Sequence, residues 1–126
     1  MVLATERLIL RPFEEKDAAD LYEYACNPRV GPDAGWPPHK SLEESREIIA
    51  TVFAAPDTFA LVDKPTGKVI GSAGFVDRHQ TLLPTPDDEI GYALNPAYWG
   101  RGLVPEAVRK LLRYGFEGRD LASIWC

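Results

Sequence analysis

The sequence predicts an α/β (α+β) domain built on a mixed, mostly antiparallel sheet, and three observations support this class. The 126 residues suffice for one hydrophobic core, so residues 1–126 are expected to form a single domain. Hydrophobic residues recur at both strand and helix periods, which gives the element order β-α-α-β-β-β-α-β. Short turns join the middle strands and a helix precedes the last one, so we expect antiparallel pairs in the middle and a final parallel pair.

The first half of the chain is predicted to contain one strand and two helices. The strand covers residues 7–11. The first helix covers residues 17–26, where hydrophobic residues recur at helical spacing: Ala18, Leu21, Tyr22 and Ala25. The second helix covers residues 42–55 and follows a capping box of Ser41 and Glu44. Its inward side chains are expected to be Ile48, Ile49, Val52 and Phe53.

A hairpin follows, with strands over residues 58–62 and 69–76 around a turn that contains proline and glycine. Gly71 and Gly74 in its second strand indicate a bulge or the close approach of another backbone. The hairpin therefore supplies the antiparallel centre of the sheet.

The last third is predicted to contain a strand over residues 89–94, a helix over residues 103–116 and a closing strand that begins at residue 123. The helix has the clearest amphipathic pattern in the chain, and its inward residues are Val104, Ala107, Val108, Leu111, Leu112 and Gly115. This strand–helix–strand unit supplies the parallel pair.

Composition excludes several functional classes. The net charge of −5 disfavours general nucleic-acid binding, which depends on many Lys and Arg contacts to phosphates. No apolar run approaches the roughly 20 residues that span a bilayer, and the N-terminus lacks the pattern of a signal peptide. Cys26 and Cys126 have no CxxC spacing, which argues against a zinc site and a disulfide scaffold. We therefore expect a cytoplasmic protein without a metal, a membrane or a nucleic-acid partner.

The most informative feature is the turn between the strand at 89–94 and the helix at 103–116, because it contains Gly100 and Gly102. A strand, a glycine turn and a helix start present backbone N–H groups that have no partner within the helix, where the helix dipole is positive. Such a site binds anions and especially phosphates. Arg101 lies inside the turn and is the best side-chain candidate for a phosphate contact.

Other nucleotide motifs fit this turn poorly. A Walker loop requires Gly-Lys-Ser/Thr, which does not follow here. A dinucleotide fingerprint requires a third glycine where this chain has Pro105, and it belongs to the first strand–helix unit of a domain. The remaining alternative is that Gly100 and Gly102 only allow a sharp turn.

The chain resembles the GNAT superfamily of acetyl-CoA-dependent N-acyltransferases, and within it the branch that includes ribosomal-protein N-terminal acetyltransferases. The resemblance covers essentially the whole chain. The segments that carry it are EIGY at 89–92, YWGRG at 98–102, EA at 106–107, ERLILRP at 6–12 and GSAGF at 71–75.

The resemblance implies a GNAT fold and the transfer of an acetyl group from acetyl-CoA to a primary amine, such as a protein N-terminus or a small-molecule amine. It implies that N–H groups of Trp99, Gly100, Arg101, Gly102 and Leu103 hold the CoA diphosphate. It also implies that the backbone of Tyr92, Ala93 and Leu94 lies beside the pantetheine arm, with a bulge that directs one N–H at the thioester oxygen.

Two differences from the family stand out. Ala97 occupies a position where the family often has Gln or Arg, so one side-chain contact to the phosphates is missing. The resemblance also implies further elements after Trp125, which carry an Asn that contacts CoA and commonly a Tyr that protonates the leaving thiolate. We therefore expect this chain to correspond to about the first three-quarters of such a domain.

Glu89 is the leading candidate for the catalytic base, because it begins the strand that would hold pantetheine. The alternative is an exposed strand-end carboxylate. Trp36 and His39 are candidates for the acceptor site, the alternatives being a core cap for Trp36 and a surface position for His39 and for His79. Strand alternation turns Tyr92 away from Glu89, which favours a packing role.

Two functions remain open on the sequence. One is an N-acetyltransferase with an amine acceptor of unknown identity. The other is a catalytically impaired remnant that binds CoA or associates with itself. An unfinished closing strand would leave an open sheet edge, so a homo-oligomer, possibly a dimer through that edge, is expected.

Overall fold

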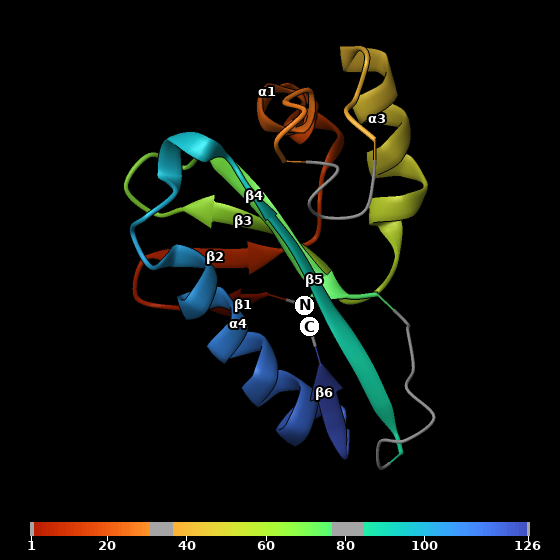
Figure 1. Ribbon diagram of the computed structural model, residues 1–126, viewed down its shortest axis with the longest axis vertical. Helices are drawn as coiled ribbons and strands as arrows, with labels where there is room; N and C mark the ends of the chain where they lie inside the picture. The colour runs from red at the N-terminus through yellow and green to blue at the C-terminus, as the bar shows by residue number, and fades with distance from the viewer. Residues whose placement is uncertain (1, 31–36, 77–84, 126) are drawn as a thin grey trace.

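The computed structural model describes residues 2–30, 37–76 and 85–125, and these form a six-stranded sheet in the order β1-β2-β3-β4-β5-β6 (Figure 1). All neighbouring strands pair antiparallel except β5 and β6, which are parallel. The predicted α+β class and pairing pattern are confirmed. The strands are β1 (Leu3–Ala4), β2 (Leu8–Arg11), β3 (Thr58–Asp63), β4 (Val69–Phe75), β5 (Asp87–Leu94) and β6 (Ser123–Trp125).

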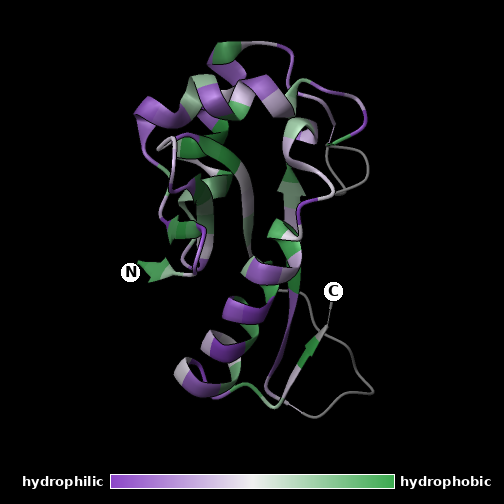
Figure 2. Ribbon diagram, turned by 90° about the vertical axis from the view of Figure 1, so that its left-hand side faces the viewer, coloured by the Kyte–Doolittle hydropathy of each residue, from purple (hydrophilic) through white to green (hydrophobic). Residues whose placement is uncertain are grey.

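Helices cover both faces of the sheet (Figure 1). Helices α1 (Ala18–Ala25) and α3 (Leu42–Ala50) lie on one face, where their apolar side chains pack with Ala93 of β5. Helix α4 (Leu103–Arg113) lies on the other face and packs on the largest hydrophobic cluster, which includes Ile90 and Leu94 of β5. Figure 2 shows the strands mainly in the hydrophobic colour, whereas the helices alternate between polar and apolar residues.

Four short helical turns accompany these elements. The 3-10 turns are η1 (Glu15–Asp17), η2 (Val52–Ala54) and η3 (Pro96–Tyr98), and the π-helical turn η4 (Tyr114–Gly118) extends α4. Neither these turns nor the two-residue strand β1 was predicted.

The second predicted helix was too long. Helix α3 ends at Ala50 because Thr51 leaves the helical conformation, with φ −117° and ψ −82°, while its hydroxyl donates to the Glu47 carbonyl at 2.7 Å. Val52 is therefore exposed rather than inward. The capping box is half confirmed: the Ser41 hydroxyl accepts from the Glu44 amide at 3.1 Å, but the Glu44 carboxylate accepts from the Lys40 amide instead.

The first helix also differs in its buried side. Tyr24 is fully buried, whereas the predicted Tyr22 is only half-buried. Helix α1 packs against both α3 and β4, so its buried surface is wider than a single helical stripe. Helix α4 ends its regular part at Arg113 and continues as the π turn, in which Gly115 is in close contact with Phe75 and Ile124.

Both expectations for the β4 glycines are confirmed. A Cβ atom on Gly71 would lie 2.5 Å from the Ala93 carbonyl oxygen, and one on Gly74 would lie 2.2 Å from the Asp57 carbonyl oxygen. The pairing of β3 with β4 shifts register between Leu61 and Val62. The glycines thus let β4 approach its neighbours closely at the centre of the sheet.

We predict that Gly74→Ala lowers the free energy of unfolding by about 3 kcal/mol, because the new Cβ would overlap backbone atoms that cannot rotate away. Urea denaturation measures the change. Gly67→Ala is the control: its Cβ meets nothing within 4 Å, and only its φ of +72° opposes alanine, at about 1 kcal/mol. Equal losses in the two variants would contradict the close approach at Gly74.

Candidate functional site

The site is organised around β5, which pairs with a different strand along each of its two edges. Strand β5 pairs with β4 over Ile90–Leu94 and with β6 over Asp87–Glu89 (Figure 1). Among the described residues, no strand pairs with Gly91–Leu94 on the side away from β4. The second half of β5 therefore has an open edge.

Hydrogen bonding at both ends of β5 shows which backbone groups reach that open edge. The Glu89 carbonyl accepts from the Val76 amide at 2.9 Å, and the Asn95 amide donates to the Ile70 carbonyl at 2.7 Å. Backbone groups alternate in direction along an antiparallel pair, so those of Ile90 and Tyr92 point away from β4. Ala93, which was predicted to lie along the pantetheine, instead turns its backbone groups toward β4.

The predicted bulge at residues 92–94 is wrong for the pairing with β4, whose register is continuous from Ile90 to Leu94. Leu94 presents only its amide at the open edge, because its carbonyl accepts from the indole Nε1 of Trp99 at 2.9 Å. Tyr92 is thus the member of the predicted trio with both backbone groups available. Ile90 offers only its carbonyl, because the parallel pairing of Glu89 with Trp125 uses the Ile90 N–H.

The turn after β5 owes its shape to two glycines in the left-handed region. Gly100 has φ +78° and Gly102 has φ +74°, a conformation that other residues rarely adopt. The Asn95 side chain fixes the entry to the turn by accepting from the Ala97 amide at 3.0 Å. A Cβ on Gly100 would meet nothing within 4 Å, so its φ angle, and not crowding, requires glycine there.

This turn leaves a run of amides without a hydrogen-bond acceptor among the residues that the structure describes: those of Gly100, Arg101, Gly102, Leu103 and Val104. Pro105 has no N–H, and the next amide, of Glu106, donates to the Gly102 carbonyl at 3.3 Å. No side chain caps α4. Unpaired amides at the positive end of a helix form an anion site.

The predicted contribution of the Trp99 amide to this anion site is wrong. That amide donates to the Pro96 carbonyl at 3.1 Å and closes the turn η3. The Trp99 ring is partly exposed, and the Arg29 guanidinium lies 5.2 Å from its centre. Trp99 therefore supports the loop through its side chain.

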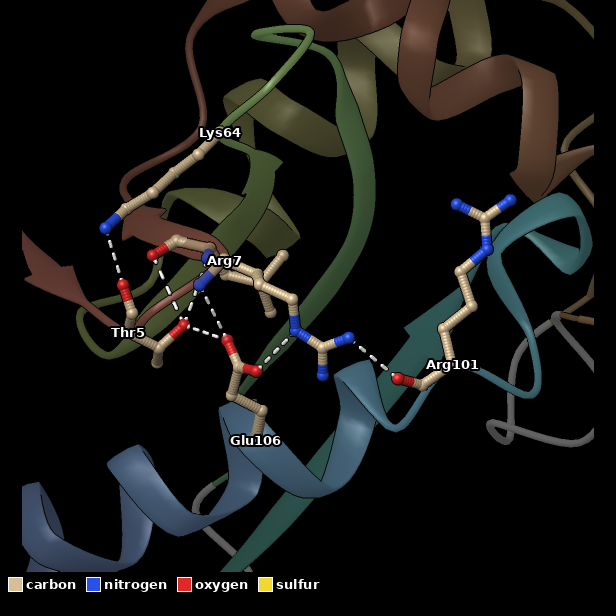
Figure 3. A network of polar contacts seen from close by, with 6 residues as sticks. Thr5, Arg7, Lys64, Arg101 and Glu106 are labelled. Carbon is tan, nitrogen blue, oxygen red and sulfur yellow. Dashed lines mark hydrogen bonds and ion pairs between the residues drawn. The ribbon is translucent and has the colours of Figure 1, made fainter.

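A polar network fixes the glycine turn to the N-terminal strands (Figure 3). The Glu106 carboxylate accepts from the Arg7 Nε at 2.8 Å, from the Arg7 amide at 3.0 Å and from the Thr5 hydroxyl. The Arg7 Nη1 donates to the Arg101 carbonyl at 2.9 Å. The carbonyl and N–H of a trans peptide point in opposite directions, so Arg7 turns the Gly102 N–H outward.

The Arg101 side chain lies on the other side of the turn from this network (Figure 3). Its guanidinium stacks over the Tyr98 ring at 5.0 Å, and its Nη2 is 3.4 Å from the Ala97 carbonyl oxygen. Arg101 is exposed, and no described carboxylate pairs with it. The turn thus combines unpaired amides with an available cation.

Glu89 is the last residue of β5 that pairs with β6, so it lies where the two strands stop pairing. By alternation its side chain shares a face with Ala93, which packs against α1 and α3. The Glu89 amide donates to the Asp88 carboxylate at 2.8 Å. Glu89 therefore lies at the start of the open edge, and its role as a base stays a prediction.

The expectation that His39 is a surface histidine is wrong. His39 is buried, its Nδ1 is 2.8 Å from the Ser45 hydroxyl, and its amide donates to the Ala25 carbonyl. Burial lowers the pKa of His39, although the nearby Glu44 carboxylate opposes this shift. His39 joins α1 to α3, and its role in acceptor binding stays a prediction. Trp36 and His79 lie outside the described residues.

A cavity of about 600 Å³ lies between η2 and the strands β4 and β5. The sequence analysis did not find it, because its walls come from segments that are far apart in the chain. Tyr92 lines it and is half exposed, so the expected packing role is wrong. The other lining residues are Val52, Phe53, Ala55, Pro56, Asp57, Thr58, Ser72, Ala73, Gly74, Phe75, Val76, Asp88, Gly91 and Arg119.

These features define an α+β domain with an open strand edge that leads into an anion-binding turn. Residues 7–126 match the acetyltransferase (GNAT) domain family, and the chain belongs to that family. Its members are acetyltransferases and generally use acetyl-CoA. Within the described ranges, no helix is long and apolar enough to cross a bilayer, and no three His, Cys, Asp or Glu side chains are placed to hold a metal ion.

Similar proteins agree with this assignment. An uncharacterized N-acetyltransferase, p20 of Bacillus licheniformis, is 34% identical over 129 residues, which cover 97% of this chain and 70% of p20. A GNAT-family acetyltransferase from Bacillus anthracis has a similar structure, with a TM-score of 0.77, 26% identity, and coverage of 96% of this chain and 69% of that one.

The ribosomal-protein-S5-alanine acetyltransferase from Vibrio fischeri shares the fold, with a TM-score of 0.70 and 22% identity over 96% of this chain and 70% of that one. This likeness supports the fold alone. The family match over residues 7–126 and the similarity to p20 confirm the resemblance to the GNAT superfamily.

We predict that Glu106→Gln lowers the free energy of unfolding by about 1–3 kcal/mol at neutral pH. Burial raises the pKa of Glu106, but the hydrogen bonds from Thr5 and Arg7 outweigh it and lower the pKa below 4.5. The stabilisation by the ionised carboxylate is therefore complete above pH 4.5 and is lost as the pH falls through the folded-state pKa. The difference between wild type and variant should shrink in that range.

Urea unfolding at neutral pH and at successive values below pH 4.5 measures this. Glu117→Gln is the control, because its pair with Arg113 is largely exposed and should contribute under about 0.5 kcal/mol. A Glu106→Gln difference that is as small as the control, or that does not change with pH, would contradict the network.

Proposed function

We propose that the chain is an N-acetyltransferase that transfers an acetyl group from acetyl-CoA to a primary amine. The observation that supports this most directly is the run of unpaired amides from Gly100 to Val104 beside the open edge of β5. A diphosphate joined to an extended amide-bearing arm needs both features side by side. Membership of the acetyltransferase family supports the same reaction.

The anion site would hold the diphosphate. Two negatively charged groups fit the unpaired amides and the positive end of α4, and Arg101 adds a charge-assisted contact. The backbone groups of Tyr92 and the carbonyl of Ile90 would bond to the amides of the pantetheine arm as a neighbouring strand would. These are the residues of this chain that would bind the cosubstrate.

When bound, acetyl-CoA supplies a thioester carbon that a neutral amine can attack. A C–N bond forms, the C–S bond breaks, and the electron pair leaves with the CoA sulfur. The attacking nitrogen must lose a proton, and Glu89 would accept it directly or through a water, because it lies at the start of the open edge. An open-edge N–H would stabilise the developing oxyanion.

A cytoplasmic location is part of the proposal, and the state of Cys26 supports it. Cys26 is a free, exposed cysteine, which a reducing compartment preserves. Acting on amines in the cytoplasm is therefore part of the proposal.

Calorimetric titration with acetyl-CoA tests the binding step. We predict saturable binding that Arg101→Ala weakens by about fivefold to tenfold, since one charge-assisted contact contributes roughly 1 kcal/mol. Arg109→Ala is the control, because Arg109 is an exposed arginine further along α4. Absence of binding at millimolar acetyl-CoA, or equal effects of the two variants, would contradict the proposal.

We predict that Glu89→Gln lowers kcat by about 100-fold or more while the Kd for acetyl-CoA stays unchanged, because only the proton acceptor is lost. Steady-state kinetics with a reactive amine acceptor measures kcat, and calorimetry measures Kd. Glu15→Gln, an exposed glutamate in η1, should leave both unchanged. A variant Glu89→Gln with wild-type kcat would remove Glu89 from the mechanism.

A further inference from the structure

The cavity between η2 and the strands β4 and β5 has the size of a small-molecule site, at about 600 Å³. Gly91 and Tyr92 form part of its wall. These residues also belong to the half of β5 that has the open edge. A molecule in the cavity therefore reaches the same strand segment that the proposed function assigns to the pantetheine arm.

The walls of the cavity are apolar and exposed. Six large hydrophobic side chains are exposed in the described part of the chain, and three of them line this one cavity. The exposed fractions are 61% for Val52, 42% for Val76 and 48% for Tyr92. Exposed apolar side chains that gather in one concave place indicate a binding surface, because scattered ones would not face a common space.

The polar end of the cavity carries paired charges. The Arg119 Nη1 is 2.9 Å from the Asp88 Oδ2 and 3.3 Å from the Asp57 Oδ2. The Tyr114 hydroxyl donates to the other oxygen of Asp57 at 2.6 Å. This end of the cavity is therefore polar and charged, in contrast to the apolar lining near η2.

Arg119 is also held from the apolar side, since its guanidinium lies 5.0 Å from the centre of the Phe75 ring. The position of this arginine is thus fixed by groups that already contact it. The rest of the lining near η2 is apolar and includes Phe53, Ala55 and Pro56. A long polycationic chain would have to place charges against these walls without a partner, which is unfavourable.

We propose that this cavity binds the acceptor substrate, and that the acceptor is a primary amine on a compact apolar arm, such as an arylalkylamine. The proposal rests on the proposed acetyltransferase function and names the substrate class of that site. The apolar arm lies against Val52 and Val76, and the amine group lies toward β5. The apolar walls select against diamines and polyamines, because a second charge would lie there without a partner.

Binding of two small amines to the full chain tests this proposal. 2-Phenylethylamine and 1,4-diaminobutane are titrated while the backbone amide signals of Gly74 and Gly91, which line the cavity, are followed by NMR. We expect both signals to shift and saturate with 2-phenylethylamine, with a Kd lower by about tenfold or more than that for the diamine. Tighter or equal binding of the diamine, or shifts confined to residues outside the cavity, would overturn the proposal.

A matched pair of variants tests whether the amine binds in the cavity. Val52→Arg adds a charge and bulk to the cavity wall and should raise the Kd for 2-phenylethylamine by about tenfold or more. Val2→Arg changes a valine of similar exposure outside the cavity and should leave that Kd unchanged. Equal effects would overturn the proposal. Shifts at Gly74 and Gly91 that depend on protein concentration without amine would assign the surface to a second copy of the chain instead.

The two proposals fail in different ways. If acetyl-CoA binds but the cavity prefers the diamine or binds neither amine, the acceptor assignment is wrong and the acetyltransferase proposal stands. If the cavity binds 2-phenylethylamine but acetyl-CoA does not bind, the acetyltransferase proposal is wrong. Transfer kinetics with the two amines gives the same ranking through kcat/KM if both proposals hold.

Discussion

The ion pair between Arg7 and Glu106 is the interaction on which the candidate site depends. It joins the turn before β2 to the first turn of α4, two segments almost a hundred residues apart in the chain. The same arginine holds the Arg101 carbonyl, so the orientation of the next peptide is set from the N-terminal end of the domain. The glycines allow the turn to adopt its shape, and Arg7 selects the direction in which its amides face.

Strand β5 carries the second constraint, because its two sets of backbone groups have different roles. One set pairs with β4 and builds the sheet, while the other set pairs with β6 up to the Ile90 N–H and faces the open edge at Tyr92. The side chains of β5 alternate between the two faces of the sheet, so one set faces α4 and the other faces α1 and α3. A single strand thus connects the anion-binding turn, the predicted base Glu89 and the cavity. This strand would fix the positions of the cosubstrate, the base and the acceptor relative to one another.

The sequence analysis found what depends on local pattern and could not find what depends on distant contacts. The amphipathic pattern of α4 and the Gly100–Gly102 turn can be identified within a few residues, and the structure has both. Tyr24 was missed because a helix covered on two sides buries more than one stripe. The end of α3 was missed because the hydroxyl of Thr51 competes for a helix carbonyl, which the hydrophobic period does not show.

The candidate site shows the same difference between features set by local sequence and features set by distant contacts. Unpaired amides were expected at the start of the helix. That the Trp99 amide is not one of them, because it bonds within the turn η3, could be known only from the path of the backbone. The pairing of Asp57 and Asp88 with Arg119 joins three distant segments, and the cavity that Tyr92 lines is likewise formed by segments far apart in the chain. Burial of His39 beside Ser45 likewise depends on how α1 and α3 pack.

Amide hydrogen exchange with and without CoA tests the central claim most directly. The account predicts added protection at the amides from Gly100 to Val104 and at Tyr92, because these acquire acceptors from the ligand. Gly91 and Ala93, which already face β4, should change little. Protection that spares the glycine turn, or that falls on Gly91 and Ala93 instead of their neighbours, would contradict it.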